Sequence, residues 1–396
     1  MIDALRPPAP GAAPSRATVD AAVAAVLDPA VLAATPQDPG FHAEGDVGLH
    51  TAMAVTALVA DPAWAALDVV GRTVTYAAVA LHDVGKATTT RHEPAGRITS
   101  RGHSARGEHD VRVALWRAGV GFGWREHVCA LVRWHQVPFF GVDRPDAARL
   151  ARRLALTLRH DWLTVVATAD AVGRRCADPA DQRRIVDQCA LWRELCDELG
   201  VLTAPPRFAD AHSQLVYLTD ASGTRSPDVP AHDDTVAEAV ILSGLPASGK
   251  STYLASRPAL PLVSLDALRV ELDVDPADPQ GPVIAAAREL ARGYLRAGRA
   301  FAWNATNLSP ALRAVVLGLC RDYRFRTHVV YCEASAPALH ARNRARPDAT
   351  RVPAAVLDRM LERWTVPTPD EAHQVSYRID DRGHDDGPAW PPRQPA

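Results

Sequence analysis

Residues 244–251 read Gly-Leu-Pro-Ala-Ser-Gly-Lys-Ser and match the phosphate-binding pattern GxxxxGK[ST] without a mismatch. The match follows the apolar run AVILS and precedes STYLASR, a stretch typical of a helix. It therefore has the strand–loop–helix context in which such a loop binds phosphate. Further short apolar runs alternate with helical stretches after residue 237. The sequence predicts an α/β domain whose parallel sheet is flanked by helices.

Each loop residue has a separate role in this chemistry. Gly244 and Gly249 let backbone N–H groups close around the phosphates of ATP, at the positive end of the following helix. Lys250 is expected to bridge the β- and γ-phosphate oxygens, and Ser251 to ligate Mg²⁺. The other residues that we assign to nucleotide binding are Ala247, Ser248, Thr252 and Arg342.

A second apolar run, PLVSL, ends at Asp266, and Arg269 follows one helical turn later. In open α/β sheets, ligand groups gather at the carboxyl ends of the strands. A carboxylate placed there can orient and deprotonate a hydroxyl acceptor, and an arginine can hold the acceptor's phosphate. We therefore predict catalytic roles for both residues. The alternative is an N-capping aspartate beside a surface arginine.

A third strand is predicted to end at Asn304-Ala-Thr-Asn, and a helical segment rich in arginine comes later. Its arginines are Arg342, Arg344, Arg346 and Arg351. Such a cluster is usually a solvated face. Near a phosphate-binding loop, it also fits a lid that lays an arginine over the transferring phosphate.

Residues 238–375 resemble the polynucleotide kinase branch of the P-loop phosphotransferases. The shared pattern is the loop, D-x-x-R, a TN-containing strand end, and R-N-x-x-R followed by V-P. The resemblance implies that Asp266 is the general base for a 5′-OH, that Arg269 binds the adjacent phosphate and that Arg346 is the lid arginine. The chain departs from the pattern at Asn304, where many relatives have aspartate, so the residue that organises the metal there stays open.

Histidine and aspartate residues gather in the first half of the chain, where nine of the fifteen histidines lie between residues 42 and 160. The adjacent pair His82-Asp83 ends a helical stretch. Imidazole and carboxylate ligands suit Mn, Fe, Co, Ni or Zn, and the lack of nearby cysteine ligands argues against a closed structural zinc site. An open site with one or two such ions activates water and clamps phosphate oxygens. The predicted ligands are His50, His82, Asp83, His103, His135 and Asp170.

The order of these residues over 40–175 resembles that of the HD phosphohydrolase superfamily. The resemblance implies that His103 and His135 are the extra histidines of two-metal members, and that the other four form the H…HD…D set. Lys86 corresponds to the lysine often found after the HD pair, and we assign it a catalytic role. The chain has only two lysines, Lys86 and Lys250, against 42 arginines, so each is expected to serve where a compact charge is required.

The segment 42–51, HAEGDVGLHT, is similar to the HD domain appended to bacterial CCA-adding enzymes, which act on RNA 3′ ends. The similarity implies that His42 and Glu44 shape the pocket. Residues 1–35 are too short to hold a nucleotidyltransferase module, so we do not expect a CCA-adding enzyme.

Composition and periodicity divide the chain into five parts. Residues 1–35 form an Ala/Pro-rich extension, 36–202 an all-α HD phosphohydrolase domain, and 203–236 a linker. Residues 237–376 form the α/β P-loop polynucleotide kinase domain, and 377–396 a disordered tail.

This order of domains resembles the bacterial HD-Pnk family of bifunctional nucleic-acid end-healing enzymes. The resemblance implies that the HD half removes 2′,3′-cyclic, 2′- or 3′-phosphates, and that the kinase half moves the γ-phosphate of ATP to a 5′-OH. It implies Mg²⁺ in the kinase, a transition metal such as Mn²⁺ in the HD site, RNA ends in preference to DNA ends, and an RNA ligase downstream. The alternatives are a small-molecule P-loop kinase fused to an HD nucleotide phosphohydrolase, and a nucleotide-sensing regulator.

Charge and hydropathy indicate which partners and which cellular compartment the protein can have. With a formal charge of −2, any contact with nucleic acid must come from a local basic patch. No apolar run approaches the roughly 20 residues of a membrane helix, and the start of the chain lacks the features of a signal peptide. Six cysteines without a CxxC pair indicate reduced thiols. We expect a cytoplasmic protein without a membrane partner, and the oligomeric state stays open.

Overall fold

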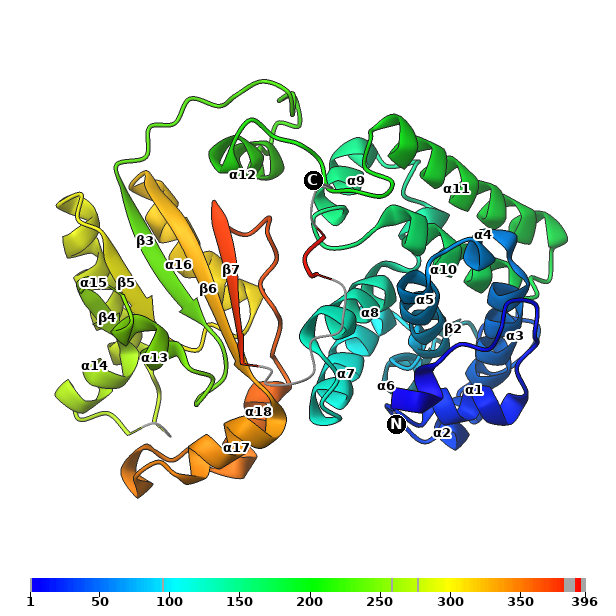
Figure 1. Ribbon diagram of the computed structural model, residues 1–396, viewed down its shortest axis with the longest axis horizontal. Coiled ribbons are helices and arrows are strands. Elements are labelled where there is room, and N and C mark those ends of the chain that lie inside the picture. The colour runs from blue at the N-terminus through cyan, green and yellow to red at the C-terminus, as the bar shows by residue number, and fades with distance from the viewer. Residues whose placement is uncertain (1, 95, 258, 276–277, 381–388, 393–396) are drawn as a thin grey trace. The chain divides into compact units, whose positions relative to one another are not determined.

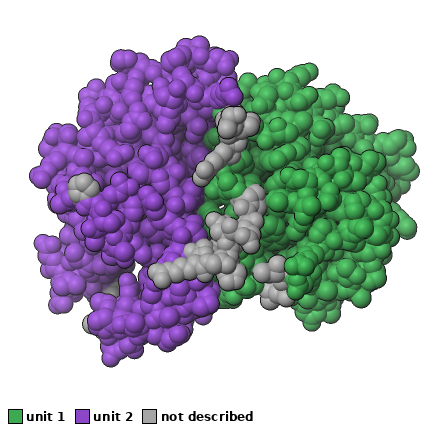
Figure 2. All heavy atoms as spheres, viewed as in Figure 1, with its two compact units in different colours: residues 1–206, 382–396 green, residues 207–381 purple. Residues whose placement is uncertain are grey.

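A computed structural model describes residues 2–94, 96–257, 259–275, 278–380 and 389–392 (Figure 1). The chain divides into two compact units (Figure 2). The first contains residues 1–206 and 382–396, and the second contains residues 207–381.

The first unit is helical apart from the short hairpin of β1 (Arg91–His92) and β2 (Ile98–Thr99) and the 3₁₀ turns η1 (Ile2–Leu5) and η2 (Val137–Phe139). Its helices are α1 (Arg16–Val23), α2 (Pro29–Ala33), α3 (Val47–Ala60), α4 (Pro62–Ala65), α5 (Val69–Leu81), α6 (Lys86–Thr89), α7 (His103–Arg117), α8 (Phe122–Trp134), α9 (Ala147–Leu154), α10 (His160–Val172) and α11 (Pro179–Glu198).

Helices α3, α5, α8 and α10 build the core of this unit. Leu58, Val79, Leu131 and Val166, one from each helix, belong to one continuous buried cluster. Aspartate side chains fix the starts of two of these helices: Asp46 accepts a hydrogen bond from the Leu49 N–H before α3, and Asp68 caps α5 in the same way. The caps set where each helix begins, and so which side chains face the centre.

The second unit is a parallel sheet covered by helices. Its strands are β3 (Ala237–Ser243), β4 (Leu262–Ser264), β5 (Phe301–Asn304), β6 (Phe325–Ala334) and β7 (Gln374–Asp380). They lie in the order β4-β5-β3-β6-β7, and every neighbouring pair is parallel. The helical elements are α12 (Ala211–Thr219), α13 (Lys250–Ala255), α14 (Leu265–Glu271), α15 (Gly281–Arg296), α16 (Pro310–Asp322), α17 (Ala336–Arg344), η3 (Asp348–Thr350) and α18 (Ala354–Leu361).

This architecture confirms the expected fold in its coarse form, a helical N-terminal region followed by an α/β region with a parallel sheet. Because all five strands run the same way, the segments that follow them gather at one edge of the sheet. The loop 244–249 follows the central strand β3 there, between the ends of β5 and β6. No helix in the described residues is both long enough and apolar enough to cross a bilayer.

The structure differs from the expected boundaries at both ends of the second unit. The predicted linker 203–236 contains α12, whose His212 Nδ1 lies 3.2 Å from His373 Nε2. This segment therefore packs as part of the second unit, although its Pro- and Asp-rich composition is typical of a linker. At the other end, β7 continues to Asp380 because Glu333 and Ala334 of β6 pair with its last residues.

The described residues 2–35 and 389–392 of the terminal extensions belong to the folded first unit. Leu5 and Val19 of the predicted extension 1–35 are buried in its core. Within the predicted disordered tail, Trp390 is buried, and its Nε1 donates to the Thr157 carbonyl at 3.0 Å. A single large aromatic side chain anchors a segment whose composition otherwise indicates disorder. The tail residues 381–388 and 393–396 lie outside the described part of the chain.

Candidate functional site

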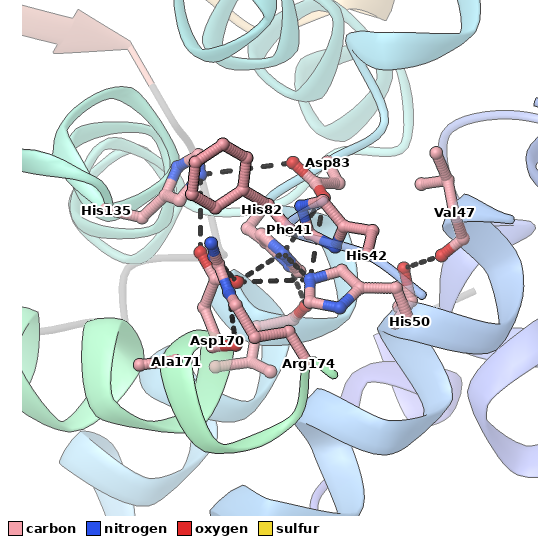
Figure 3. Close-up of polar contacts among 12 residues, drawn as sticks. Phe41, His42, Val47, His50, His82, Asp83, His135, Asp170, Ala171 and Arg174 are labelled. Carbon is pink, nitrogen blue, oxygen red and sulfur yellow. Dashed lines mark hydrogen bonds and ion pairs between the residues drawn. The ribbon is translucent and has the colours of Figure 1, made fainter. Parts of the chain in front are cut away.

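The six residues predicted as metal ligands come together in the first unit, and Figure 3 labels all of them except His103. His50 lies on α3, and His82 and Asp83 directly follow α5. The other three come from the start of α7, the residue after α8 and the last turn of α10: His103, His135 and Asp170. All six are buried, and we call them the donor cluster.

The four histidines of the donor cluster all turn Nδ1 away from its centre. Three of them face backbone acceptors, Val79 O for His82 (2.7 Å), Ser100 O for His103 (2.8 Å) and Val132 O for His135 (2.8 Å), and His50 Nδ1 lies 3.0 Å from Glu44 Oε1. An imidazole that donates from Nδ1 keeps a free lone pair on Nε2. His82, His103 and His135 are thereby held in the tautomer that binds a metal ion through Nε2.

Asp83 presents its two carboxylate oxygens to different histidines. Its Oδ2 lies 3.2 Å from His82 Nε2 and 3.7 Å from His50 Nε2. Its Oδ1 lies 3.4 Å from His103 Nε2 and 3.9 Å from His135 Nε2. Two donor sets that share one carboxylate therefore lie side by side, as two neighbouring divalent ions require.

Asp170 completes the same pattern from the opposite helix. Its Oδ1 lies 3.1 Å from His50 Nε2, and its Oδ2 lies 3.9 Å from His135 Nε2. Arg174, one turn later on the chain, forms a buried ion pair with Oδ1, and its guanidinium lies 4.8 Å from the Phe139 ring. Burial opposes ionisation of Asp170, but Arg174 and the nearby histidines keep its pKa well below the usual range. The carboxylate stays charged.

Four buried atoms of the donor cluster have no hydrogen-bond partner among the described residues, and two of them face each other across the site. These two atoms are Asp83 Oδ1 and His135 Nε2. A buried polar atom without a partner costs about 1–3 kcal/mol, unless something binds it. Burial, together with neighbouring His82, lowers the pKa of His135 to about 3, so its ring is neutral near pH 7. A carboxylate oxygen facing neutral imidazole nitrogens fits a divalent metal ion.

Further polar groups surround the donor cluster. Lys86 Nζ lies 2.7 Å from Asp83 Oδ2 and donates to Gln37 Oε1 at 2.7 Å. Glu44 Oε1 contacts His42 Nδ1 at 2.9 Å as well as the Nδ1 of His50. Lys86 and Glu44 are therefore placed to hold the cluster's carboxylate and imidazole groups in position.

Two glycines allow the elements of the site to approach one another. A Cβ on Gly85 would lie 2.1 Å from the backbone oxygen of His103, so only glycine lets the turn after Asp83 pack against the start of α7. A Cβ on Gly173 would lie 2.3 Å from Ala54 Cα. This close approach of the end of α10 to α3 holds Asp170 beside His50.

The second unit places the predicted phosphate loop between β3 and α13. Gly244 has φ +140° and Gly249 has φ +103°, backbone conformations that favour glycine. A Cβ on Gly244 would also lie 2.2 Å from Cys332 O on β6. Ala247 adopts φ +63° within the same turn. The loop is thus built from residues that can adopt left-handed backbone.

Two side chains of the loop, Lys250 and Ser248, can donate hydrogen bonds to a bound anion. Lys250 Nζ donates to the carbonyls of Gly244 and Leu245 at 2.8 and 2.7 Å. Burial lowers the pKa of Lys250 to about 8. Ser248 Oγ is buried and has no hydrogen-bond partner among the described residues. Two further residues assigned to nucleotide or Mg²⁺ binding, Ser251 and Thr252, lie exposed in the first turn of α13.

Asp266 and Arg269 form an ion pair with each other on α14. The side chain of Asp266 is 86% exposed, so a substrate can reach its carboxylate. Arg269 also donates from Nε to Gln280 Oε1 at 2.7 Å. Asp266 raises and Arg346 lowers the pKa of Lys250, which places both within electrostatic reach of the loop. The charges of the predicted base and the predicted lid arginine therefore act on the loop lysine.

Two residues of the predicted lid have partners within the protein instead of facing the phosphate loop alone. Arg342, which we assigned to nucleotide binding, forms an ion pair with Asp380 at the end of β7. Asn343 donates from Nδ2 to Val352 O at 2.7 Å and accepts from Val352 N at 3.1 Å. Asn343 thereby closes the turn that carries Arg346.

The segment after β5 contains a residue whose role the sequence did not reveal. Asn307 Nδ2 donates to Leu242 O at 2.7 Å, and its own carbonyl accepts from Ser243 Oγ at 3.1 Å. Both partners end the strand that leads into the phosphate loop. Asn304, the position at which the chain departs from the kinase pattern, ends β5 opposite Ser264 of β4.

A comparison with known protein families identifies the type of domain in the second unit. A family profile described as "AAA domain" matches residues 240–367. Together with the loop and the parallel sheet, this match identifies a P-loop kinase-like domain, which implies ATP and Mg²⁺. A solved structure of a proposed kinase from Chloroflexus aurantiacus J-10-fl has 21% sequence identity and a TM-score of 0.32, and covers 38% of this chain and 90% of its own.

A curated relative matches part of the chain. The multifunctional CCA protein of Thioalkalivibrio sulfidiphilus (strain HL-EbGR7) is 33% identical over 131 residues, which make up 32% of this chain. The chain spans 29% of the length of that relative.

Proposed function

We propose that the chain is a bifunctional nucleic-acid end-healing enzyme. The helical unit, as an HD phosphohydrolase, removes 2′,3′-cyclic, 2′- or 3′-phosphates. The kinase-like unit transfers the γ-phosphate of ATP to a 5′-OH end. RNA cleaved by transesterification carries both of these ends, and an RNA ligase can join the strands only after both are changed.

The observation that carries this proposal is the arrangement around Asp83. Its two oxygens face two pairs of histidines, and every one of those rings is held with Nε2 toward the centre. Such a set suits hydrolysis of a phosphate ester, and it lies in the same chain as a loop built for phosphate transfer. Two phosphate chemistries in one chain are best explained by a substrate with one end that must lose a phosphate and another end that must gain one.

In the helical unit, divalent ions bound by the two donor sets would activate water and clamp phosphate oxygens. Asp83 would be shared between the two sets, with Lys86 balancing the charge of Oδ2. Arg174 holds Asp170 in its ionised form, so both carboxylates remain available as ligands. Glu44 orients His50 through Nδ1.

In the kinase-like unit, Lys250 leaves the carbonyls of Gly244 and Leu245 to bind the β- and γ-phosphates. Asp266 accepts the proton of the 5′-OH as the bond between the 5′ oxygen and the γ-phosphorus forms. The bond from that phosphorus to the β–γ bridging oxygen breaks, and ADP leaves. Arg346 balances the charge on the transferring group, and Arg269 holds the phosphate next to the acceptor.

The proposal is tested with an RNA oligonucleotide that has a 5′-OH and a 2′,3′-cyclic phosphate, incubated with ATP, Mg²⁺ and Mn²⁺. Mass spectrometry of the product reads each end separately. A 5′-phosphate together with a 3′-OH would support both activities. ATP consumption on a small hydroxylated compound, with neither RNA end changed, would instead support the small-molecule kinase.

A further inference from the structure

The loop before α3 displays an aromatic side chain next to the donor cluster. Phe41 is 40% exposed, whereas the following residue, His42, is buried with its ring centroid 4.6 Å from that of His50. Figure 3 draws the Phe41 ring in front of the residues of the cluster. An exposed apolar ring at the edge of a buried ionic site is accessible to a ligand that enters the site.

Hydrogen bonds fix the backbone on both sides of Phe41. They run from Phe41 N and His42 N to Asp38 O (3.1 and 2.8 Å), from Ala43 N to Arg175 O (2.7 Å) and from Ala177 N to Gly40 O (2.9 Å). Glu44 Oε2 also accepts from Arg175 N at 2.9 Å. The loop is therefore tied to the segment that follows Asp170 and Arg174. A ring held on such a backbone loses little conformational freedom when it binds a ligand.

The donor cluster and Phe41 differ in the part of a nucleotide that each can bind. The buried charges of Lys86 and Arg174, with the donor cluster, suit an anionic phosphate but offer no apolar face. Phe41 offers such a face and no charge. A nucleobase stacks on an aromatic side chain with a gain of about 1–3 kcal/mol.

We propose that Phe41 stacks on the terminal nucleobase of a strand whose 2′- or 3′-phosphate binds at the donor cluster. The inference rests on the proposed phosphohydrolase function and adds the group that recognises the base. It makes the helical unit selective for nucleotide ends over phosphate esters that lack a base.

The test compares two oligonucleotides that differ only at the last residue. One ends in adenosine 3′-phosphate, and the other in a tetrahydrofuran 3′-phosphate, which lacks the base. Wild type is expected to have a KM about tenfold lower for the first, and Phe41→Ala to lose this preference. Phe41→Trp should retain it. Leu191→Ala, which removes an exposed apolar side chain on α11, should behave as wild type.

A second measurement reads stacking without catalysis. An oligonucleotide ending in 2-aminopurine and a non-hydrolysable 3′-methylenephosphonate is titrated with the metal-loaded protein, and the emission of the base is followed. Emission should fall with wild type and with Phe41→Trp, and fall much less with Phe41→Ala.

The outcomes separate the inference from the function on which it rests. Release of phosphate from both oligonucleotides with equal KM in wild type would overturn the stacking role and leave the phosphohydrolase intact. The same holds if Phe41→Ala raises both KM values equally, because the residue would then only support the loop. Release from neither oligonucleotide, with any added metal, would overturn the phosphohydrolase and the inference together.

Discussion

His50 Nε2 lies 3.1 Å from Asp170 Oδ1, although the two residues come from helices far apart in the sequence. Their approach depends on Gly173, where a Cβ would lie 2.3 Å from Ala54 Cα. The backbone of α10 and the backbone of α3 meet directly at this point. The geometry of the donor cluster is therefore set by helix packing as well as by the ligands themselves.

Gly173→Ala should separate α3 from α10 and weaken both stability and metal binding. Relief of the clash requires a backbone shift, for which overpacked sites typically lose about 1–3 kcal/mol of the free energy of unfolding. Chemical denaturation measures the stability, and calorimetric titration with Mn²⁺ measures the affinity. Gly293→Ala, on α15 with nothing within 4 Å of its Cβ, is the control and should be stabilising by up to about 1 kcal/mol. Unchanged Mn²⁺ affinity in Gly173→Ala would contradict the packing argument.

The two sides of Asp83 should be separable by mutation. His135→Ala removes a ligand from one donor set and should reduce the bound metal from two ions to one. Inductively coupled plasma mass spectrometry of acid-digested protein measures the metal content. Asp83→Ala removes the shared carboxylate and should reduce the occupancy of both metal positions. Each change should abolish release of a 3′-phosphate and leave 5′-phosphorylation intact. Full metal content in Asp83→Ala would remove the residue from the ligand set.

Chelation and metal addition should act on the first unit alone. A metal that binds only the folded chain stabilises it by about 2.7 kcal/mol at a free concentration of 100 Kd. Mn²⁺ should therefore raise the midpoint of one unfolding transition in a calorimetric scan, and EDTA should reverse the rise. Asp83→Ala is the matched control, because it should abolish the response. A response of equal size in that variant would place the binding elsewhere.

The sequence identified the ligands better than it identified the groups that hold them. The adjacent pair His82-Asp83 and its glycine are a local signal, and the strand–loop–helix context marks the phosphate loop. In contrast, Gln37 reaches Lys86 only after folding, and no short pattern predicts that contact. Arg174 could have been found from its helical spacing to Asp170, since one turn separates the two.

The sequence also did not predict two domain boundaries or the partner of Arg342, because these too depend on contacts between distant segments. Composition indicates a linker around α12 and disorder near Trp390, but a few buried side chains override it in each case. The pairing of Arg342 with Asp380 depends on where β7 ends, which the sequence did not determine. Contacts between distant segments decide these features, and local periodicity carries no information about them.

Asp266→Ala should lower 5′-phosphorylation at least a hundredfold, because general base catalysis contributes about 10²–10⁴ in rate. Transfer of ³²P from ATP to a 5′-OH oligonucleotide measures the effect. Arg342→Ala is the matched variant: because its guanidinium is paired with Asp380, it should change the KM for ATP only slightly. Phosphate release from 3′ ends should be unaffected in both. A loss of both activities in Asp266→Ala would argue against independent sites.

The affinity for ATP should fall as the pH rises through 8. Lys250 has a pKa of about 8 in the folded chain, below its ordinary 10.5, and only its charged form pairs with phosphate. If bound phosphate restores the ordinary pKa, Kd should rise about fivefold between pH 8 and pH 9. For folding the sign is opposite: between pH 8 and 10.5 the unfolded chain holds a proton that the folded chain has released, so this group's contribution to stability rises with pH.

Calorimetric titration of ATP at several pH values measures this dependence. Binding at pH 8 should also take up protons, which is read from the dependence of the heat on the buffer. Lys250→Met should bind ATP weakly at every pH and lose the dependence. A Kd that is constant from pH 7 to 9 in wild type would show that Lys250 stays charged.

Trp390→Ala should destabilise the first unit and leave the second unchanged. The Trp390 indole is buried, donates to Thr157 O, and lies with its ring centroid 5.6 Å from that of Phe122, while His127 Nε2 lies 3.1 Å from Ala389 O. Removing a buried tryptophan side chain costs about 3–5 kcal/mol, and a terminal segment that detaches easily should fall at the lower end. Calorimetry should resolve one unfolding transition that Mn²⁺ shifts and another that ATP shifts. The transition that Trp390→Ala lowers identifies the unit that has lost stability. Trp390→Phe, which keeps most of the apolar area without the donor, should lose about 1 kcal/mol. If Trp390→Ala lowers the ATP-sensitive transition instead, the tail supports the kinase-like unit and not the helical one.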